Sequence, residues 1–246
     1  MHAFDTKPRL AAISSTFICS ILFFCLIPNV VFSRVVVFDH IVIKGQKVML
    51  KAETRGRLFP KGGELVSFFV SGNAIGKNLS GGDGVAYKAF VPETSGMLSL
   101  EVRSGEDKAS GLVLSLEKGQ GVVFVDIEGA LARKGLSMEP RPGGQKAIAA
   151  ISAKLPVVFL QTSIVGRGLL KRWLKENNFP ELPVLSWRNG MVFEETVEKD
   201  LKLKAIIASP KVIESAQKYN PRAYSLEETD NAQEVDDWSK IAKALE

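Results

Sequence analysis

The sequence predicts a two-domain protein, in which an all-β sandwich is followed by an α/β domain with a doubly wound parallel sheet. Two observations predict these classes. Residues 34–118 contain short apolar runs separated by glycine, proline and aspartate turn signals, the spacing typical of an antiparallel β-sandwich. Residues 119–246 alternate continuous apolar runs with segments of helical periodicity, which is typical of parallel strands joined by right-handed helical connections.

The composition excludes several kinds of chemistry. The 246 residues are 46% hydrophobic and 24% charged, as in a folded globular protein, and the formal charge of +5 comes from scattered basic residues, so we expect no nucleic-acid partner. The cysteines are Cys19 and Cys25, and the histidines are His2 and His40. Without its N-terminal segment the chain would keep only His40, which excludes disulfide frameworks, Cys/His zinc sites and cysteine nucleophiles.

The N-terminus has the features of a targeting segment. Lys7 and Arg9 precede a long apolar run, and the small residue Ser33 follows at its end. This order of regions predicts a signal peptide over residues 1–33, cleaved after Ser33, and hence an exported protein that is periplasmic or secreted. An uncleaved membrane anchor is the alternative, because residues 10–32 approach the roughly 20 residues that span a bilayer.

The first half of the remaining chain contains the strand signals of a sandwich. Apolar or alternating runs predict strands at residues 35–38, 42–43, 48–52, 65–70, 85–91, 97–102 and 112–116. Residues 72–78 have glycines spaced almost as in a phosphate-binding loop, but they are one residue short of that motif and lie between strands. We therefore interpret them as a hairpin turn.

Turn residues recur through this half in a recognisable order. They lie at Gly62–Phe68, Gly76–Lys77, Gly82–Ala86, Pro92 and Gly96. In these residues the chain resembles the bacterial immunoglobulin-like modules found in exported proteins. The resemblance implies an immunoglobulin-like sandwich over residues 34–118 and a protein partner bound through it. Because turn chemistry specifies a fold, it implies no particular activity.

The second half alternates predicted strands with predicted helices. Buried strands are expected at residues 122–125, 157–160, 184–185, 205–208 and 223–226. Helices are expected to begin near Pro142, Leu169, Val212 and Val235. In an α/β domain of this kind, the functional site lies at the carboxyl ends of the strands. The residue at the end of the first buried strand is Asp126.

The run Asp126-Ile127-Glu128-Gly129-Ala130-Leu131 follows that strand. It resembles the first motif of the haloacid dehalogenase (HAD)-like superfamily. The resemblance implies a HAD-like Rossmannoid fold over residues 119–246, without a large cap because only 25 residues separate Leu131 from Val157. It also implies that Asp126 is the nucleophile of a phosphoryl transfer and a magnesium ligand, and that Glu128 is the general acid/base.

Further residues resemble one branch of that superfamily and imply a substrate site. Residues 158–166, 173–175 and 179–185 are similar to the lipin-type branch, which includes phosphatidate phosphatases. The resemblance implies that Gln161, Thr162 and Ser163 bind a phosphate. The lysine of the third motif is Lys199, Lys202 or Lys204, and spacing does not choose among them. We assign Lys202 and Lys211 to the substrate as well, because Lys211 lies where a positive charge would face Asp126.

Departures from the motifs leave three hypotheses open. Glu128 and Ala130 replace an aspartate and a threonine, and residues 207–212 lack the acidic pair of the fourth motif. Because magnesium requires several oxygen ligands, we favour a catalytically impaired, phosphatase-like pseudoenzyme that binds a phosphorylated small molecule or a lipid headgroup, or that supports the sandwich. The alternatives are an active magnesium-dependent phosphatase, acting on phosphomonoesters or phosphatidate, and an adhesion or interaction module.

Overall fold

This computed structural model describes residues 35–57, 59–133, 138–235 and 237–245. The described residues belong to one compact unit. The signal peptide or anchor predicted over residues 1–33 lies outside the described residues. In the described part of the chain, no helix is long and apolar enough to cross a membrane.

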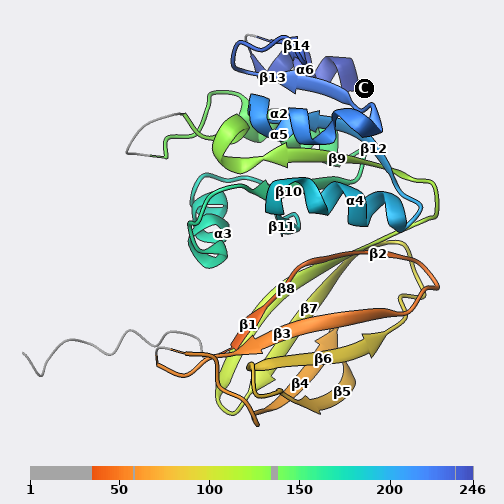
Figure 1. Ribbon diagram of the computed structural model, residues 1–246, viewed down its shortest axis with the longest axis vertical. Helices are drawn as coiled ribbons and strands as arrows, with labels where there is room; N and C mark the ends of the chain where they lie inside the picture. Colours follow the sequence, from red (N-terminus) through yellow and green to blue (C-terminus); the bar gives the residue numbers. More distant parts are fainter. Residues whose placement is uncertain (1–34, 58, 134–137, 236, 246) are drawn as a thin grey trace, which may run out of the picture. The chain divides into compact units, whose positions relative to one another are not determined.

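Eight strands of the first half form two sheets (Figure 1). Their bounds are β1 (Val35–Val37), β2 (His40–Ile43), β3 (Val48–Thr54), β4 (Leu65–Val70), β5 (Asn73–Leu79), β6 (Val85–Phe90), β7 (Gly96–Ser104) and β8 (Asp107–Leu116). One sheet has the order β1-β3-β6 and the other β2-β8-β7-β4-β5. All pairings are antiparallel except that of β2 with β8. The strand order is that of an immunoglobulin-like sandwich.

Alternating side chains fill the interior of this sandwich. Leu50 and Ala52 on β3, Phe68 on β4 and Leu100 on β7 are all 0% exposed and belong to one hydrophobic cluster. Their neighbours along each strand face outward, because successive side chains of a strand point to opposite faces. This alternation sets the register of the strands, since a slip by one residue would move the apolar side chains to the surface.

The second half contains a six-stranded sheet in which every pairing is parallel. The strand order is β11-β10-β9-β12-β13-β14. The strands are β9 (Gly121–Asp126), β10 (Val157–Gln161), β11 (Val184–Ser186), β12 (Lys202–Ile207), β13 (Arg222–Ser225) and β14 (Gln233–Glu234). Between and after them lie η2 (Ile127–Leu131), α2 (Gly144–Ser152), α3 (Arg167–Glu176), η3 (Arg188–Gly190), α4 (Met191–Glu198), α5 (Pro210–Ala216), η4 (Gln217–Tyr219) and α6 (Trp238–Leu245).

Hydrophobic clusters cover both faces of the parallel sheet. Val123 and Val125 of β9 belong to one cluster, with residues of α2 and α6, whereas Phe124 belongs to another, with residues of α4 and α5. The second cluster also includes residues of β2 and β8, namely Ile41, Ile43, Leu114 and Leu116. The five-stranded sheet of the sandwich and the parallel sheet therefore share a core.

A buried carboxylate connects the same two parts. Asp39 lies between β1 and β2, and its side chain is 0% exposed. Its Oδ1 accepts hydrogen bonds from the Leu112 backbone N–H at 2.9 Å and from Lys171 Nζ at 2.7 Å, and its Oδ2 accepts one from the Val184 backbone N–H at 2.8 Å. One side chain thus satisfies donors on β8, on α3 and at the start of β11.

The fold class predicted from the sequence was wrong as stated. Strands account for 40% of the structure and helices for 26%, so the chain is mostly β. The alternating pattern predicts parallel pairing of strands, but it cannot identify a superfamily, because many unrelated proteins share such sheets. The domain bounds 34–118 and 119–246 stay a prediction.

Asp39→Asn is expected to lower the free energy of unfolding by about 3 kcal/mol, because an amide cannot pair with Lys171 and would turn its NH₂ toward a fixed donor. Urea unfolding of the full chain measures this change. Glu117→Gln is the matched control, because Glu117 also pairs with a lysine, Lys44, but on the surface. Equal stability of the two variants would contradict the structural role of Asp39.

A second prediction concerns His40, whose Nε2 accepts a hydrogen bond from the Lys51 backbone N–H at 3.2 Å. Burial, followed by the positive charge of Lys199, lowers the pKa of His40 from 6.5 to about 4. Below pH 6.5, His40 therefore binds a proton in the unfolded chain but not in the folded chain. The free energy of unfolding falls as the pH drops toward 4.

The expected loss from His40 between pH 7.5 and pH 5 is about 2 kcal/mol of unfolding free energy. Urea unfolding at the two pH values measures it, with the His40→Gln variant as the reference. The variant should lose about 2 kcal/mol less than the unmodified chain over this interval. Parallel losses in both proteins would show that His40 does not titrate as described.

Candidate functional site

Polar side chains from three neighbouring strands meet at the carboxyl edge of the parallel sheet. Asp126 ends β9, Thr162 and Ser163 follow β10, and Ser209 follows β12. The register places Asp126 opposite Leu160 on β10, and Val125 opposite Ile207 on β12. Because parallel strands end at the same edge, these side chains lie together although 83 residues separate Asp126 from Ser209.

Asp126 is fully buried at 0% exposure and is held by four donors. Its Oδ1 accepts hydrogen bonds from the Gly129 backbone N–H and from Thr162 Oγ1, both at 3.0 Å. Its Oδ2 accepts them from Ser209 Oγ at 2.8 Å and from the Ser209 backbone N–H at 3.2 Å. Burial raises the pKa of Asp126, and the hydrogen bonds from Gly129, Ser209 and Thr162 oppose that rise.

Glu128 is held by the loop after β10. Its Oε2 accepts hydrogen bonds from the Thr162 backbone N–H at 3.1 Å and from Thr162 Oγ1 at 3.0 Å. Its Oε1 accepts them from the Ser163 backbone N–H at 3.2 Å and from Ser163 Oγ at 2.7 Å. Thr162 Oγ1 carries a single proton and lies within hydrogen-bond distance of a carboxylate oxygen of Asp126 and of one of Glu128. The Thr162 side chain therefore bridges the two carboxylates.

The structure brings together some of the residues predicted from the sequence and separates others. Asp126, Glu128, Thr162 and Ser163 form one hydrogen-bonded group. Gln161 adjoins it, but its Nε2 donates to the backbone carbonyls of Ser163 and Val165 and so shapes the loop.

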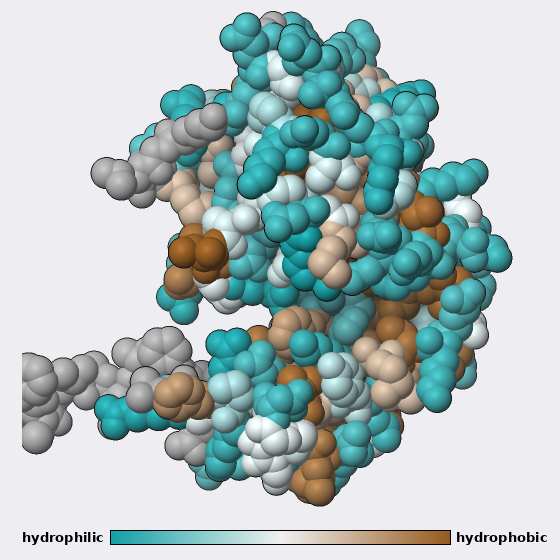
Figure 2. Space-filling model, viewed as in Figure 1, coloured by the Kyte–Doolittle hydropathy of each residue, from teal (hydrophilic) through white to brown (hydrophobic). Residues whose placement is uncertain are grey.

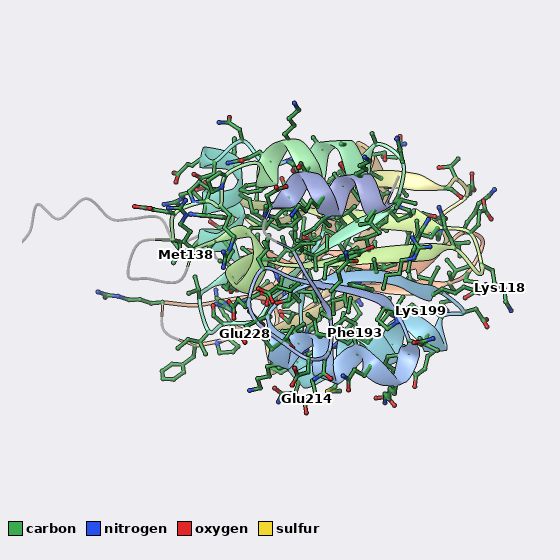
Figure 3. All side chains as sticks on the ribbon, turned by 90° about the horizontal axis from the view of Figure 1, so that it is seen from above. Lys118, Met138, Phe193, Lys199, Glu214 and Glu228 are labelled. Carbon is green, nitrogen blue, oxygen red and sulfur yellow. The ribbon has the colours of Figure 1, made fainter. Side chains whose placement is uncertain are left out.

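The lysines lie elsewhere. Lys202 pairs with Gly121 at the amino end of β12, and Lys211 Nζ lies 5.5 Å from the centre of the Trp187 ring. Lys204 packs along Gly121, and Figure 3 shows Lys199 on the side of Lys118, away from Met138. Strand direction explains the separation of Lys202 and Lys204, because the amino end of a strand lies opposite the carboxyl edge that holds Asp126.

The donors around Asp126 do not fit a magnesium ion. Magnesium requires oxygen ligands in near-octahedral geometry, whereas two backbone N–H groups, which cannot reorient, point at the oxygens of Asp126. Among the described residues, no three His, Cys, Asp or Glu side chains gather as a metal site. The group Asp126–Glu128–Thr162–Ser163–Ser209 instead holds three loops together by hydrogen bonds.

Ser209 is the member of this group that the sequence analysis missed. In residues 207–212 the sequence analysis considered the missing acids and Lys211, but not Ser209. A signal was present, because Ser209 precedes Pro210 and α5 begins at that proline. Serine before a helix whose first residue is proline is a typical helix start, which would have placed a hydroxyl and a free backbone N–H beside the end of β9.

Comparisons with known proteins give similarities of fold only. No protein-family model and no curated protein matches the sequence. Solved structures that resemble part of the chain include invasin, described as a bacterial integrin-binding protein, with 16% identity and a TM-score of 0.30 over 35% of this chain and 19% of invasin. Fibronectin(III)-like modules of CbhA from Clostridium thermocellum match with 14% identity and a TM-score of 0.25, over 34% of this chain and 97% of theirs.

The resemblance to the HAD-like superfamily and its lipin-type branch was wrong. No family model or curated protein supports it, and the solved structures named above are an integrin-binding protein and fibronectin(III)-like modules. The description of the chain as phosphatase-like or as a pseudoenzyme depended on that resemblance and was also wrong. The motif was misleading because an aspartate at the end of a buried strand also serves to cap the following turn, as Asp126 does by accepting from Gly129.

Asp126→Asn is expected to lower the free energy of unfolding by about 1–3 kcal/mol, because the amide NH₂ would face either the Gly129 or the Ser209 backbone N–H and leave it unpaired. Chemical denaturation of the full chain measures this. The control is Asp230→Asn at an exposed position, which should leave stability unchanged. Unaltered stability of Asp126→Asn would contradict the structural role.

Gly129→Ala is a second test of the hydrogen-bonded group around Asp126. A Cβ on Gly129 would clash with Asp126 Oδ2 and would lie 2.9 Å from the Ser209 backbone nitrogen, so Asp126 or Ser209 must move. We expect a lower melting temperature and altered amide resonances of Thr162 and Ser209. Gly168→Ala is the control, since nothing lies within 4 Å of its added Cβ. An unchanged melting temperature in Gly129→Ala would show that the group tolerates displacement.

Proposed function

We propose that this chain is an exported interaction module that binds a protein partner through its immunoglobulin-like sandwich. The observation that carries the proposal is a pair of exposed leucines at the edge of the five-stranded sheet. Leu65 on β4 and Leu79 on β5 lie directly opposite each other in the register. They are 51% and 60% exposed, respectively.

The surroundings of this leucine pair support a binding role. β5 is the last strand of its sheet, and most of its residues are exposed. Figure 2 shows hydrophobic surface at the end of the sandwich that holds β4 and β5. An edge strand offers unpaired backbone groups to an added strand of another protein, and neighbouring apolar side chains supply contact area. A partner that pairs with β5 would bury both leucines.

The hydrogen bonds at the carboxyl edge of the parallel sheet favour a binding role over a catalytic one. The oxygens of Asp126 and Glu128 already accept hydrogen bonds from the chain's own Gly129, Thr162, Ser163 and Ser209. A nucleophile must have an oxygen free to attack, and a substrate would have to displace these internal donors. The group is therefore better suited to holding loops than to turnover.

The binding surface can be tested by photo-cross-linking in the producing cell. A photoreactive amino acid at position 79 of the full chain is expected to give a covalent adduct with one protein. The same amino acid at position 97 is the control, because Met97 is also exposed but lies on β7. The double variant Leu65→Thr/Leu79→Thr should reduce affinity for the captured protein at least tenfold. Equal adducts from both positions would refute the proposed surface.

The proposal also predicts the outcome of a phosphatase assay. Hydrolysis of p-nitrophenyl phosphate by the full chain with magnesium should equal that of Asp126→Asn. The Asp230→Asn variant and a buffer blank measure the background. Turnover that disappears specifically in Asp126→Asn would overturn the proposal and establish an enzyme.

A further inference from the structure

A cavity that is separate from the Asp126 group and from the leucine pair is lined by several positively charged side chains. Its volume is about 350 Å³, within the range of small-molecule sites. Its lining comes from the segment around His40, from β3 and β6 of the sandwich, and from the start of α3 and from α4. The cavity therefore lies where the sandwich meets the helices that follow β10 and β11.

The charges that line this cavity are unbalanced. Lys51, Arg167 and Lys199 are part of its wall, and none of them has a salt bridge within the described part of the chain. The two carboxylates of the lining are already engaged. Asp39 pairs with Lys171, at 2.7 Å, and Glu195 pairs with Arg188, at 2.5 Å. Three positive side chains thus line the cavity without a salt bridge among the described residues, and Asp39 and Glu195 act on Arg167 and Lys199 only from a longer distance.

Arg167 is the most constrained of these cations. Its guanidinium lies 4.7 Å from the centre of the Phe38 ring, and its Nη2 donates to Ser186 Oγ at 3.1 Å. Its Nε is buried and has no hydrogen-bond partner. Burial lowers the pKa of Arg167 and also that of Lys199. A buried donor without an acceptor is unfavourable, so an acceptor placed there by a ligand would remove that cost.

His40 is a further polar side chain in the lining of this cavity. Its pKa is lowered to about 4, first by burial and then by Lys199, with Arg167 and Lys51 acting in the same direction. All three cations therefore influence the same ring. Because Nε2 accepts from the Lys51 backbone N–H, the proton of the neutral imidazole lies on Nδ1, which is then a donor.

The remaining wall is hydrophobic. Phe38, Met49 and Tyr87 line the cavity, and Met49 and Tyr87 are 49% and 44% exposed. Lys51 Nζ lies 4.6 Å and the Arg167 guanidinium 4.7 Å from the centre of the same Phe38 ring, so both cations contact one aromatic side chain. A small inorganic ion would leave this hydrophobic surface uncovered, whereas an organic anion would contact both the charges and the rings.

We propose that this cavity binds a small organic carboxylate, with its charge held by Arg167, Lys51 and Lys199 and its nonpolar part against Met49 and Tyr87. The guanidinium and the ammonium groups donate hydrogen bonds to the carboxylate oxygens. The site is separate from the Leu65–Leu79 pair, so it does not depend on the proposed protein partner.

The experiment compares two ligands that differ only in charge. Phenylacetate and phenylacetamide are titrated into the full chain, and amide chemical shifts are followed by NMR. Phenylacetate is expected to bind at least tenfold more tightly than the amide and to shift the resonances of Lys51, Arg167 and Tyr87. Equal affinities, or shifts elsewhere only, would overturn the proposal.

Substitutions locate the site. Arg167→Gln and, separately, Lys199→Gln should each weaken phenylacetate binding at least fivefold, whereas Lys202→Gln, outside the cavity, should leave it unchanged. Lys199→Gln keeps the test valid if the buried Arg167 is needed for folding. Undiminished binding by Lys199→Gln would count against the site. The Leu65→Thr/Leu79→Thr variant should bind phenylacetate normally, which separates a failure here from a failure of the proposed function.

A carboxylate can also be presented by an acidic side chain of another protein. The peptide acetyl-Phe-Glu-amide, compared with acetyl-Phe-Gln-amide, distinguishes this source. Binding of the glutamate peptide more tightly than phenylacetate would assign the site to a protein side chain, and the reverse would assign it to a free molecule. Both results support a carboxylate site, whereas equal binding of the two peptides together with equal binding of the two small ligands would refute it.

Discussion

The buried carboxylate of Asp39 is the constraint on which the relation between the two sheets depends. It interrupts the first strand signal of the chain, so that β1 joins one sheet of the sandwich and β2 joins the other. Its oxygens then accept from β8, from the start of β11 and from Lys171 of α3. A buried charge is tolerated only when it is paired and hydrogen-bonded, so these elements must meet at this point. The shared hydrophobic core of β2, β8 and the parallel sheet lies beside it.

Three acids and three cations of this molecule differ in how far other parts of the chain hydrogen-bond or pair with them. Asp39, Asp126 and Glu128 are each surrounded by donors from the chain itself, and most of those donors are backbone N–H groups or hydroxyls. By contrast, Lys51, Arg167 and Lys199 face a cavity without a salt-bridge partner among the described residues. The carboxylate oxygens of these acids already accept hydrogen bonds from the chain, so a ligand would have to displace those donors.

Local patterns identified most strands but failed at particular elements. The residues of β5 were interpreted as a hairpin turn because their glycines are spaced almost as in a phosphate-binding loop and lie between two predicted strands. They form a strand because β4 supplies their hydrogen bonds from Leu65 to Val70. Helix α4 was also missed, since only Val192, Phe193 and Thr196 of its residues are buried and the lysines after it dominate the pattern. In both places tertiary pairing outweighed a weak local preference.

The sequence by itself determined where apolar residues alternate and where they run continuously, and hence which segments pair as a sandwich and which as parallel strands. It also placed Asp126 at the end of a buried strand, because a strand ends where its apolar run ends. Only the tertiary structure decided what these polar residues do. The partners of Asp39 lie 73, 132 and 145 residues away, and Ser209 lies 83 residues from Asp126. Hydrogen bonding between such distant residues leaves no periodic trace in the sequence, so a satisfied structural carboxylate and a reactive one look the same until the chain is folded.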